Sequence, residues 1–155
     1  MIQRIQSLYL ILTTLLPLLF LKGSFLRFVN NTGSDFMIKF RGLYQISGEK
    51  TSELITNLIT LQLIIILIPL FSLITILLFR KRKIQLITSS VVILLSIILI
   101  ITGILNSISV IRDYQADLVP DFRMIVPLLI LLFAVMAYRG IRKDEKLIES
   151  YDRLR

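Results

Sequence analysis

Arg80-Lys81-Arg82-Lys83 is a run of four consecutive cations between two apolar runs, 54–79 and 84–111. Each run exceeds the roughly 20 residues that a helix needs to cross about 30 Å of hydrocarbon. Two helices joined by so short a polar turn must lie antiparallel and side by side. The stretch therefore predicts a pair of membrane helices joined by a basic hinge.

The composition supports a membrane protein. Hydrophobic residues make up 55% of the 155 residues, above the roughly 45–50% that is usual in soluble proteins. The formal net charge is +8, but the cations flank apolar runs and do not form a basic face interleaved with aromatic residues. We therefore expect anionic lipid headgroups as partners, and no nucleic acid.

The sequence contains no Cys and no His. The usual zinc ligand sets, haem ligation by these residues, and Cys-His or Ser-His catalysis are therefore excluded. Charged residues occur only at the ends of the apolar runs and not in their interior, whereas ion and proton pathways usually need one there. We expect a protein that is not an enzyme and carries no cofactor.

Two further apolar runs, 5–22 and 122–139, predict a first and a fourth helix. A cation followed by an apolar run also describes a secretory signal, but Lys22-Gly23-Ser24 lacks the small-x-small cleavage pattern. The first helix is therefore predicted to be retained. Beyond the fourth helix, residues 140–155 predict an amphipathic tail, because three apolar residues fall on one side of a helix: Leu147, Tyr151 and Leu154. Such a tail lies on the membrane surface or binds a partner.

The loop 24–50 changes from continuous to alternating hydrophobicity. One side of a period-two pattern through 36–46 holds Phe36, Ile38, Phe40, Tyr44 and Ile46, and the other holds Lys39, Arg41 and Gln45. This pattern is typical of a half-buried strand. With a weaker partner strand at 25–29, this pattern predicts a small β-hairpin. Its apolar face either covers the helix ends or offers a docking edge to another protein.

The predicted fold class is therefore an all-α membrane protein, one domain over residues 1–155, with four antiparallel transmembrane helices and a β-hairpin in the first external loop. Eleven of the 18 Lys and Arg fall on the side that holds both termini and the basic hinge. The positive-inside rule places that side in the cytoplasm. The cations expected to meet lipid headgroups are Arg80, Lys81, Arg82, Lys83, Arg139, Arg142 and Lys143.

Small residues recur along the third helix. Ser89, Ser96 and Gly103 are seven apart, and Ser107 follows four beyond. Small side chains on one stripe let a neighbouring backbone approach closely. The pattern predicts a seam for helix packing.

Three aspartates stand four apart in the loop after the third helix: Asp113, Asp117 and Asp121. If that helix continued to Asp117, the first two carboxylates would share a face and could hold a divalent cation. The alternative is a solvated loop in which Asp121 caps the next helix.

The two ends of the chain carry a resemblance. Met1-Ile2-Gln3-Arg4-Ile5-Gln6-Ser7-Leu8-Tyr9-Leu10 and Tyr138-Arg139-Gly140-Ile141-Arg142-Lys143-Asp144-Glu145-Lys146-Leu147, closing on Asp152-Arg153-Leu154-Arg155, resemble an uncharacterised bacterial family of four-helix integral membrane proteins, domain of unknown function family 4293. The resemblance covers the whole length in layout and is specific at the termini. It implies an inner-membrane location and assigns no activity.

Three functions follow as hypotheses. The leading one is an accessory or structural subunit of a larger membrane protein complex. The first alternative is a small transporter or channel for a neutral solute, using Gln62 and Asn106. The second alternative is a lipid-acting enzyme that uses the external aspartates.

Overall fold

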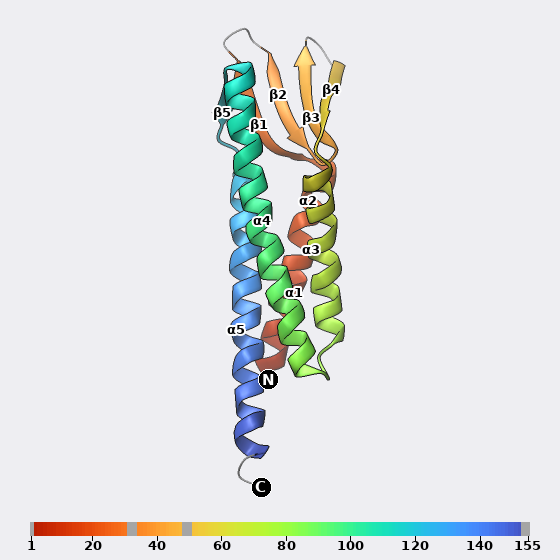
Figure 1. Ribbon diagram of the computed structural model, residues 1–155, viewed down its shortest axis with the longest axis vertical. Helices are drawn as coiled ribbons and strands as arrows, with labels where there is room; N and C mark the ends of the chain where they lie inside the picture. Colours follow the sequence, from red (N-terminus) through yellow and green to blue (C-terminus); the bar gives the residue numbers. More distant parts are fainter. Residues whose placement is uncertain (1, 31–33, 48–50, 153–155) are drawn as a thin grey trace.

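The computed structural model describes residues 2–30, 34–47 and 51–152. Within them, four helical segments are long and apolar enough to cross a membrane. They lie lengthwise in a bundle with both termini toward one end and a β-sheet at the other (Figure 1). The segments are Ile5–Lys22, Ile59–Leu77, Arg82–Tyr114 and Phe122–Leu147.

The first segment is not one regular helix. Pro17 lies in a 3₁₀ turn, η1, because its ring has no N–H to donate to the preceding turn. The other three segments contain one long helix each, and the last begins with a second 3₁₀ turn. The bounds are α1 Ile2–Leu15, η1 Leu16–Leu18, α2 Leu19–Lys22, α3 Ile59–Leu77, α4 Arg82–Tyr114, η2 Phe122–Ile125 and α5 Val126–Asp152.

The sheet corrects the predicted fold class. In the described residues it has five antiparallel strands in the order β4-β3-β2-β1-β5, so the protein is not an all-α bundle decorated with a hairpin. The strands are β1 Ser24–Asn30, β2 Asp35–Lys39, β3 Gly42–Ser47, β4 Thr51–Asn57 and β5 Ala116–Val119. The last strand comes from the loop between α4 and α5, far along the chain from the other four.

The fourth strand includes residues 54–57, which the apolar run 54–79 predicts as the start of the second helix. Ser52 and Glu53 fit a helix cap and a first-turn acid, but in the structure they pair with Ile46 and Gln45 of β3. Helix α3 therefore begins at Ile59 and not at Leu54. Pairing with β3 satisfies the backbone groups on one side of this segment and overrides its local preference.

The predicted strand through residues 36–46 is in fact a hairpin. It turns at Phe40 and Arg41, so Ile38 pairs with Leu43 and Met37 pairs with Tyr44. Since opposed residues share a face of the sheet, the turn reverses the predicted position of Tyr44. Its side chain lies on the face opposite Phe36 and Ile38.

The buried face of the sheet packs on the last turns of α4. Phe28, Phe36 and Ile38 are fully or almost fully buried, and the ring of Phe36 lies 4.7 Å from that of Tyr114, centroid to centroid. With 33 residues, α4 is about 50 Å long at 1.5 Å per residue. This length exceeds the hydrocarbon thickness, and Figure 1 shows the surplus running beside the sheet.

Helix α5 continues through most of the predicted tail. It runs unbroken to Asp152 and extends beyond the neighbouring helices at the end that holds both termini (Figure 1). Near this end Asp144 accepts hydrogen bonds from Gln6 Nε2 at 2.9 Å and from Arg82 Nη1 at 3.3 Å. These bonds join α1, α4 and α5.

Candidate functional site

The basic hinge is divided between two roles. Arg80, Lys81 and Lys83 are exposed, as headgroup contact requires. Arg82 is different, because its side chain is only 15% exposed and forms an ion pair with Asp144. The structure therefore places three of the four cations where lipid headgroups could reach them.

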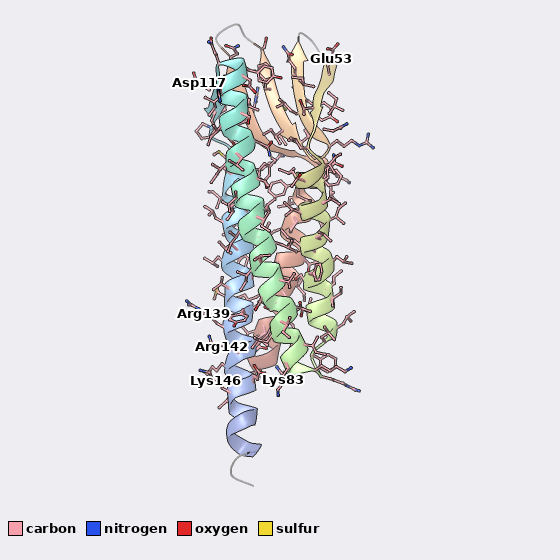
Figure 2. The ribbon with its side chains drawn as sticks, in the orientation of Figure 1. Glu53, Lys83, Asp117, Arg139, Arg142 and Lys146 are labelled. Carbon is pink, nitrogen blue, oxygen red and sulfur yellow. The ribbon has the colours of Figure 1, made fainter. Side chains whose placement is uncertain are left out.

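The cations of the fourth helix that are predicted to contact lipid headgroups lie on α5, in the part that is predicted to be cytoplasmic. Arg139, Arg142 and Lys143 are exposed, and Figure 2 shows Arg139 and Arg142 at the same end of the bundle as Lys83. With Lys146 they line a hollow of about 520 Å³. All of these cations come from one helix, so they form a strip along it and not an enclosed site.

The small-residue stripe of α4 is largely buried. Ser89, Ser96 and Gly103 are buried and Ser107 is half-buried. A Cβ added at Gly103 would lie 2.9 Å from Cε1 of Phe25. At Gly103 the stripe therefore packs against an aromatic ring from β1, and not against the backbone of a helix.

The aspartates do not share a helix face. Helix α4 ends at Tyr114, and Gln115 adopts a left-handed conformation with φ of 49°. Asp113 therefore belongs to the helix and Asp117 to β5, while Asp121 takes the cap position of η2 without a side-chain cap bond. No group of three or more acidic residues that could hold a metal ion occurs in the described part of the chain.

The two amides of the transport hypothesis lie in separate surroundings. Gln62 Nε2 donates to the carbonyl oxygen of Arg41 at 2.7 Å and so ties α3 to the β2–β3 turn. Asn106 Nδ2 donates to Thr102 O of its own helix at 2.7 Å. Asn106 also lines a cavity of about 220 Å³ beneath the sheet, and Gln62 is not part of that lining.

The residues predicted to bind a partner are also dispersed. Phe36 and Ile38 are 3% and 0% exposed, so their face covers α4. Phe40 is half-buried and Leu147 is exposed. Tyr151 lies in the last turn of α5, and Leu154 lies outside the described residues.

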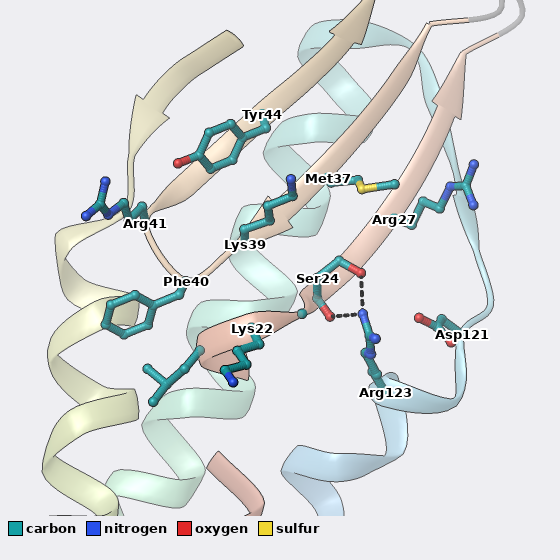
Figure 3. Close-up of a pocket in the computed structure, with 12 residues that line it drawn as sticks. Lys22, Ser24, Arg27, Met37, Lys39, Phe40, Arg41, Tyr44, Asp121 and Arg123 are labelled. Atoms are coloured by element: carbon teal, nitrogen blue, oxygen red, sulfur yellow. Dashed lines mark hydrogen bonds between the residues drawn. The ribbon is translucent and has the colours of Figure 1, made fainter. Parts of the chain in front are cut away.

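The most distinctive site is a pocket of about 550 Å³ where the sheet meets the bundle. We call it the basic pocket, because five cations line it: Lys22, Arg27, Lys39, Arg41 and Arg123. They come from the end of α2, from β1, from β2 and its turn, and from η2. Figure 3 shows them on the face of the sheet that points away from α4, with Lys22, Lys39 and Arg123 between the guanidinium groups of Arg27 and Arg41, which point to opposite sides.

Hydrogen bonds and close packing shape the basic pocket. Arg123 Nη1 donates to Ser24 Oγ at 2.9 Å and more weakly to Ser24 O at 3.4 Å, as Figure 3 shows. A Cβ added at Gly23 would lie 2.8 Å from Arg123 Nη1, so this glycine leaves room for the guanidinium. Lys39 Nζ lies 5.0 Å from the centre of the Tyr44 ring, a cation–π distance.

Sequence reasoning missed the basic pocket. The sequence predicts its cations only as separate charges on the external side, since Lys22 and Arg123 are about a hundred residues apart. The available signal was the alternation in β1 and β2, where Arg27 and Lys39 fall opposite buried neighbours. That pattern places each cation on the outer face but does not show that they meet.

The fold and the basic pocket define the class of protein. Its described part is a bundle with four helices of membrane-spanning length, and a charged antiparallel sheet lies at one end. The family model described as "Domain of unknown function (DUF4293)" matches residues 2–154. The chain belongs to this family, as the resemblance of its two ends predicted. Comparison with curated proteins and with solved structures found no match.

Proposed function

We propose that this chain is a non-catalytic inner-membrane protein with both termini in the cytoplasm, and that it serves as an accessory subunit of a larger membrane complex. The sheet carries the docking surface. The observation that supports this proposal is the outer edge of β4, a seven-residue strand at the end of the strand order.

The β4 edge has the properties of a site for strand addition. Its residues from Glu53 to Asn57 are all exposed, and the described strands pair with it on one side only. Leu54 and Ile55 are 44% and 37% exposed. An extended segment of a partner protein would bond to the free backbone groups and cover these two side chains.

The proposed orientation rests on charge. By sequence position, eleven of the 18 Lys and Arg belong to the side predicted to hold the termini and the basic hinge, and short basic loops stay in the cytoplasm. Figure 2 shows Glu53 and Asp117 at the sheet end and Lys83, Arg142 and Lys146 at the other. The sheet would then face the periplasm, where a periplasmic or membrane-embedded partner can reach it.

Site-specific photo-crosslinking in native membranes tests the docking edge. A photoreactive residue at Ile55 should give one discrete crosslinked partner. The same residue at Leu128, which is 57% exposed on α5, is the matched control and should give none. Absence of any crosslink from Ile55, together with isolation of the chain as a lone monomer in mild detergent, would contradict the proposal.

Cysteine labelling tests the orientation separately. Because the sequence has no Cys, Asp117→Cys and Lys146→Cys each introduce a single thiol at an exposed position. A membrane-impermeant maleimide should label Asp117→Cys once the outer membrane is permeabilised, and Lys146→Cys only after the inner membrane is broken. The reverse pattern would show that the sheet faces the cytoplasm.

A further inference from the structure

We propose that the basic pocket binds the phosphate of an anionic phospholipid headgroup, in the leaflet that lies against the sheet. Phospholipids and soluble phosphate compounds both carry the phosphate group that this pocket would bind. The position of the pocket at the ends of the membrane-length helices points to a lipid as its source. This inference goes beyond the proposed docking function, because it concerns a different face of the sheet and needs no partner protein.

The charge of the pocket calls for an anion. Five cations and one carboxylate, Asp121, line it. Among the described residues only one of these cations forms an ion pair, Arg27 with Asp35. Lys22, Lys39, Arg41 and Arg123 form no ion pair in the described part of the chain, so the cations of the lining outnumber its one carboxylate. A bound phosphate would relieve the repulsion between them.

The donors in the pocket suit phosphate oxygens. Lys39 offers an ammonium group and Arg41 a planar fork of N–H donors, and both form charge-assisted bonds with phosphate. Ser24 Oγ accepts a hydrogen bond from Arg123, so its own hydroxyl proton remains able to donate. The Tyr44 hydroxyl on the same lining supplies a further donor.

The position of the pocket along the membrane-length helices points to a lipid as the source of the phosphate. Lys22 is the last residue of the first membrane-length segment, and Arg123 is the second residue of the fourth. Leu21 also lines the pocket and is 46% exposed. On the bundle side of it, Leu18 and Leu19 are 42% and 55% exposed. A phosphate held by the cations would thus have apolar side chains beside it for the acyl chains of the same lipid.

Lipid retention measured by native mass spectrometry tests the inference. The full chain is purified in mild detergent and titrated with phosphatidylglycerol, with phosphatidylcholine as the zwitterionic comparison. The pocket variant carries Lys22→Gln, Lys39→Gln and Arg41→Gln. The control variant, Arg80→Gln with Lys81→Gln and Lys83→Gln, removes the same charge from exposed positions at the opposite end.

The wild type and the control variant should retain phosphatidylglycerol alike, and the pocket variant should bind it about tenfold more weakly, as expected when charge-assisted bonds to phosphate are lost. Far-UV circular dichroism and the melting temperature check that each variant folds. Should the triple variant fail to fold, Lys39→Gln alone is compared with Lys39→Arg. Only the variant that loses the charge should lose the lipid.

Three results would overturn the inference. Equal losses in the pocket and control variants would mean that the cations attract lipid diffusely and form no site. Undiminished retention by a folded pocket variant would mean that the lipid binds elsewhere. Displacement of the lipid by inorganic phosphate or glycerophosphate, at concentrations where sodium chloride of equal ionic strength has no effect, would assign the pocket to a soluble phosphate compound.

Discussion

Gly42→Ala is the sharpest test of the sheet. Gly42 opens β3 and pairs with Asn57 at the end of β4. An added Cβ would overlap the carbonyl oxygen of Thr56 and would lie only 3.0 Å from Thr56 C and 3.2 Å from Asn57 Cα. These are backbone atoms and cannot rotate away as a side chain would. The methyl group must therefore push the start of β3 away from the end of β4.

The expected cost follows from this geometry. Overpacking of a close contact costs about 1–3 kcal/mol, and the upper value applies because the obstacle is backbone. Separation of the strands would also disturb the neighbouring Leu43–Thr56 pair. It would further weaken the bond from Gln62 to Arg41 O, which adjoins the same turn. We expect Gly42→Ala to destabilise the protein by about 3 kcal/mol.

The assay combines thermal unfolding in detergent with hydrogen exchange of the amides in 51–57. The control is Gly140→Ala on α5, where the added Cβ would meet Cγ of Gln6 at 2.7 Å. Gln6 is buried and bonded to Asp144, so the gain in helix propensity, about 1 kcal/mol, offsets only part of that crowding. We expect the control to leave exchange in 51–57 unchanged even where it lowers the melting temperature, because its contact joins α5 to α1 and not to the sheet.

One result would refute this reasoning. If residues 54–57 formed the first turn of a helix, as Ser52 and Glu53 suggest on their own, Gly42 would have no close contact with Thr56. Gly42→Ala would then alter neither the melting temperature nor the exchange of 51–57. That outcome would remove β4 from the sheet, and with it the proposed docking edge.

Three further predictions concern stability and the pocket. Asp144→Ala should destabilise the protein by about 2–3 kcal/mol in unfolding measurements. The reason is that Arg82 and Gln6 at the helix junction lose their shared acceptor. A double-mutant cycle of Arg82→Gln and Asp144→Ala that shows no coupling energy would contradict this. Ile38→Ala should lower the free energy of unfolding by about 3 kcal/mol, because Ile38 is 0% exposed. Ile55→Ala should lower it by less than about 1 kcal/mol. Equal losses would mean that the buried and exposed faces of the sheet are misassigned. Gly23→Ala should displace Arg123 from Ser24 and lower phosphatidylglycerol retention without a large loss of stability, and unchanged retention would show that Arg123 is not needed in the pocket.

Parts of the candidate site could be predicted from the sequence. The exposed cations of the hinge and of α5 follow from their position at the ends of long apolar runs. The pairing of Arg82 with Asp144 could not be predicted, because the two residues are 62 positions apart and meet only when α4 packs on α5. The basic pocket was missed for the same reason.

The four apolar helices and the antiparallel turn at Arg80–Lys83 could be predicted from the sequence, because the length and hydrophobicity of a run are local properties. The alternation of apolar and polar residues also indicated a strand at 36–40. The sequence did not predict that 51–57 and 116–119 join a five-stranded sheet within the described residues. Strand pairing and the gathering of Lys22, Arg27 and Arg123 depend on which distant segments meet, and no local pattern carries that information.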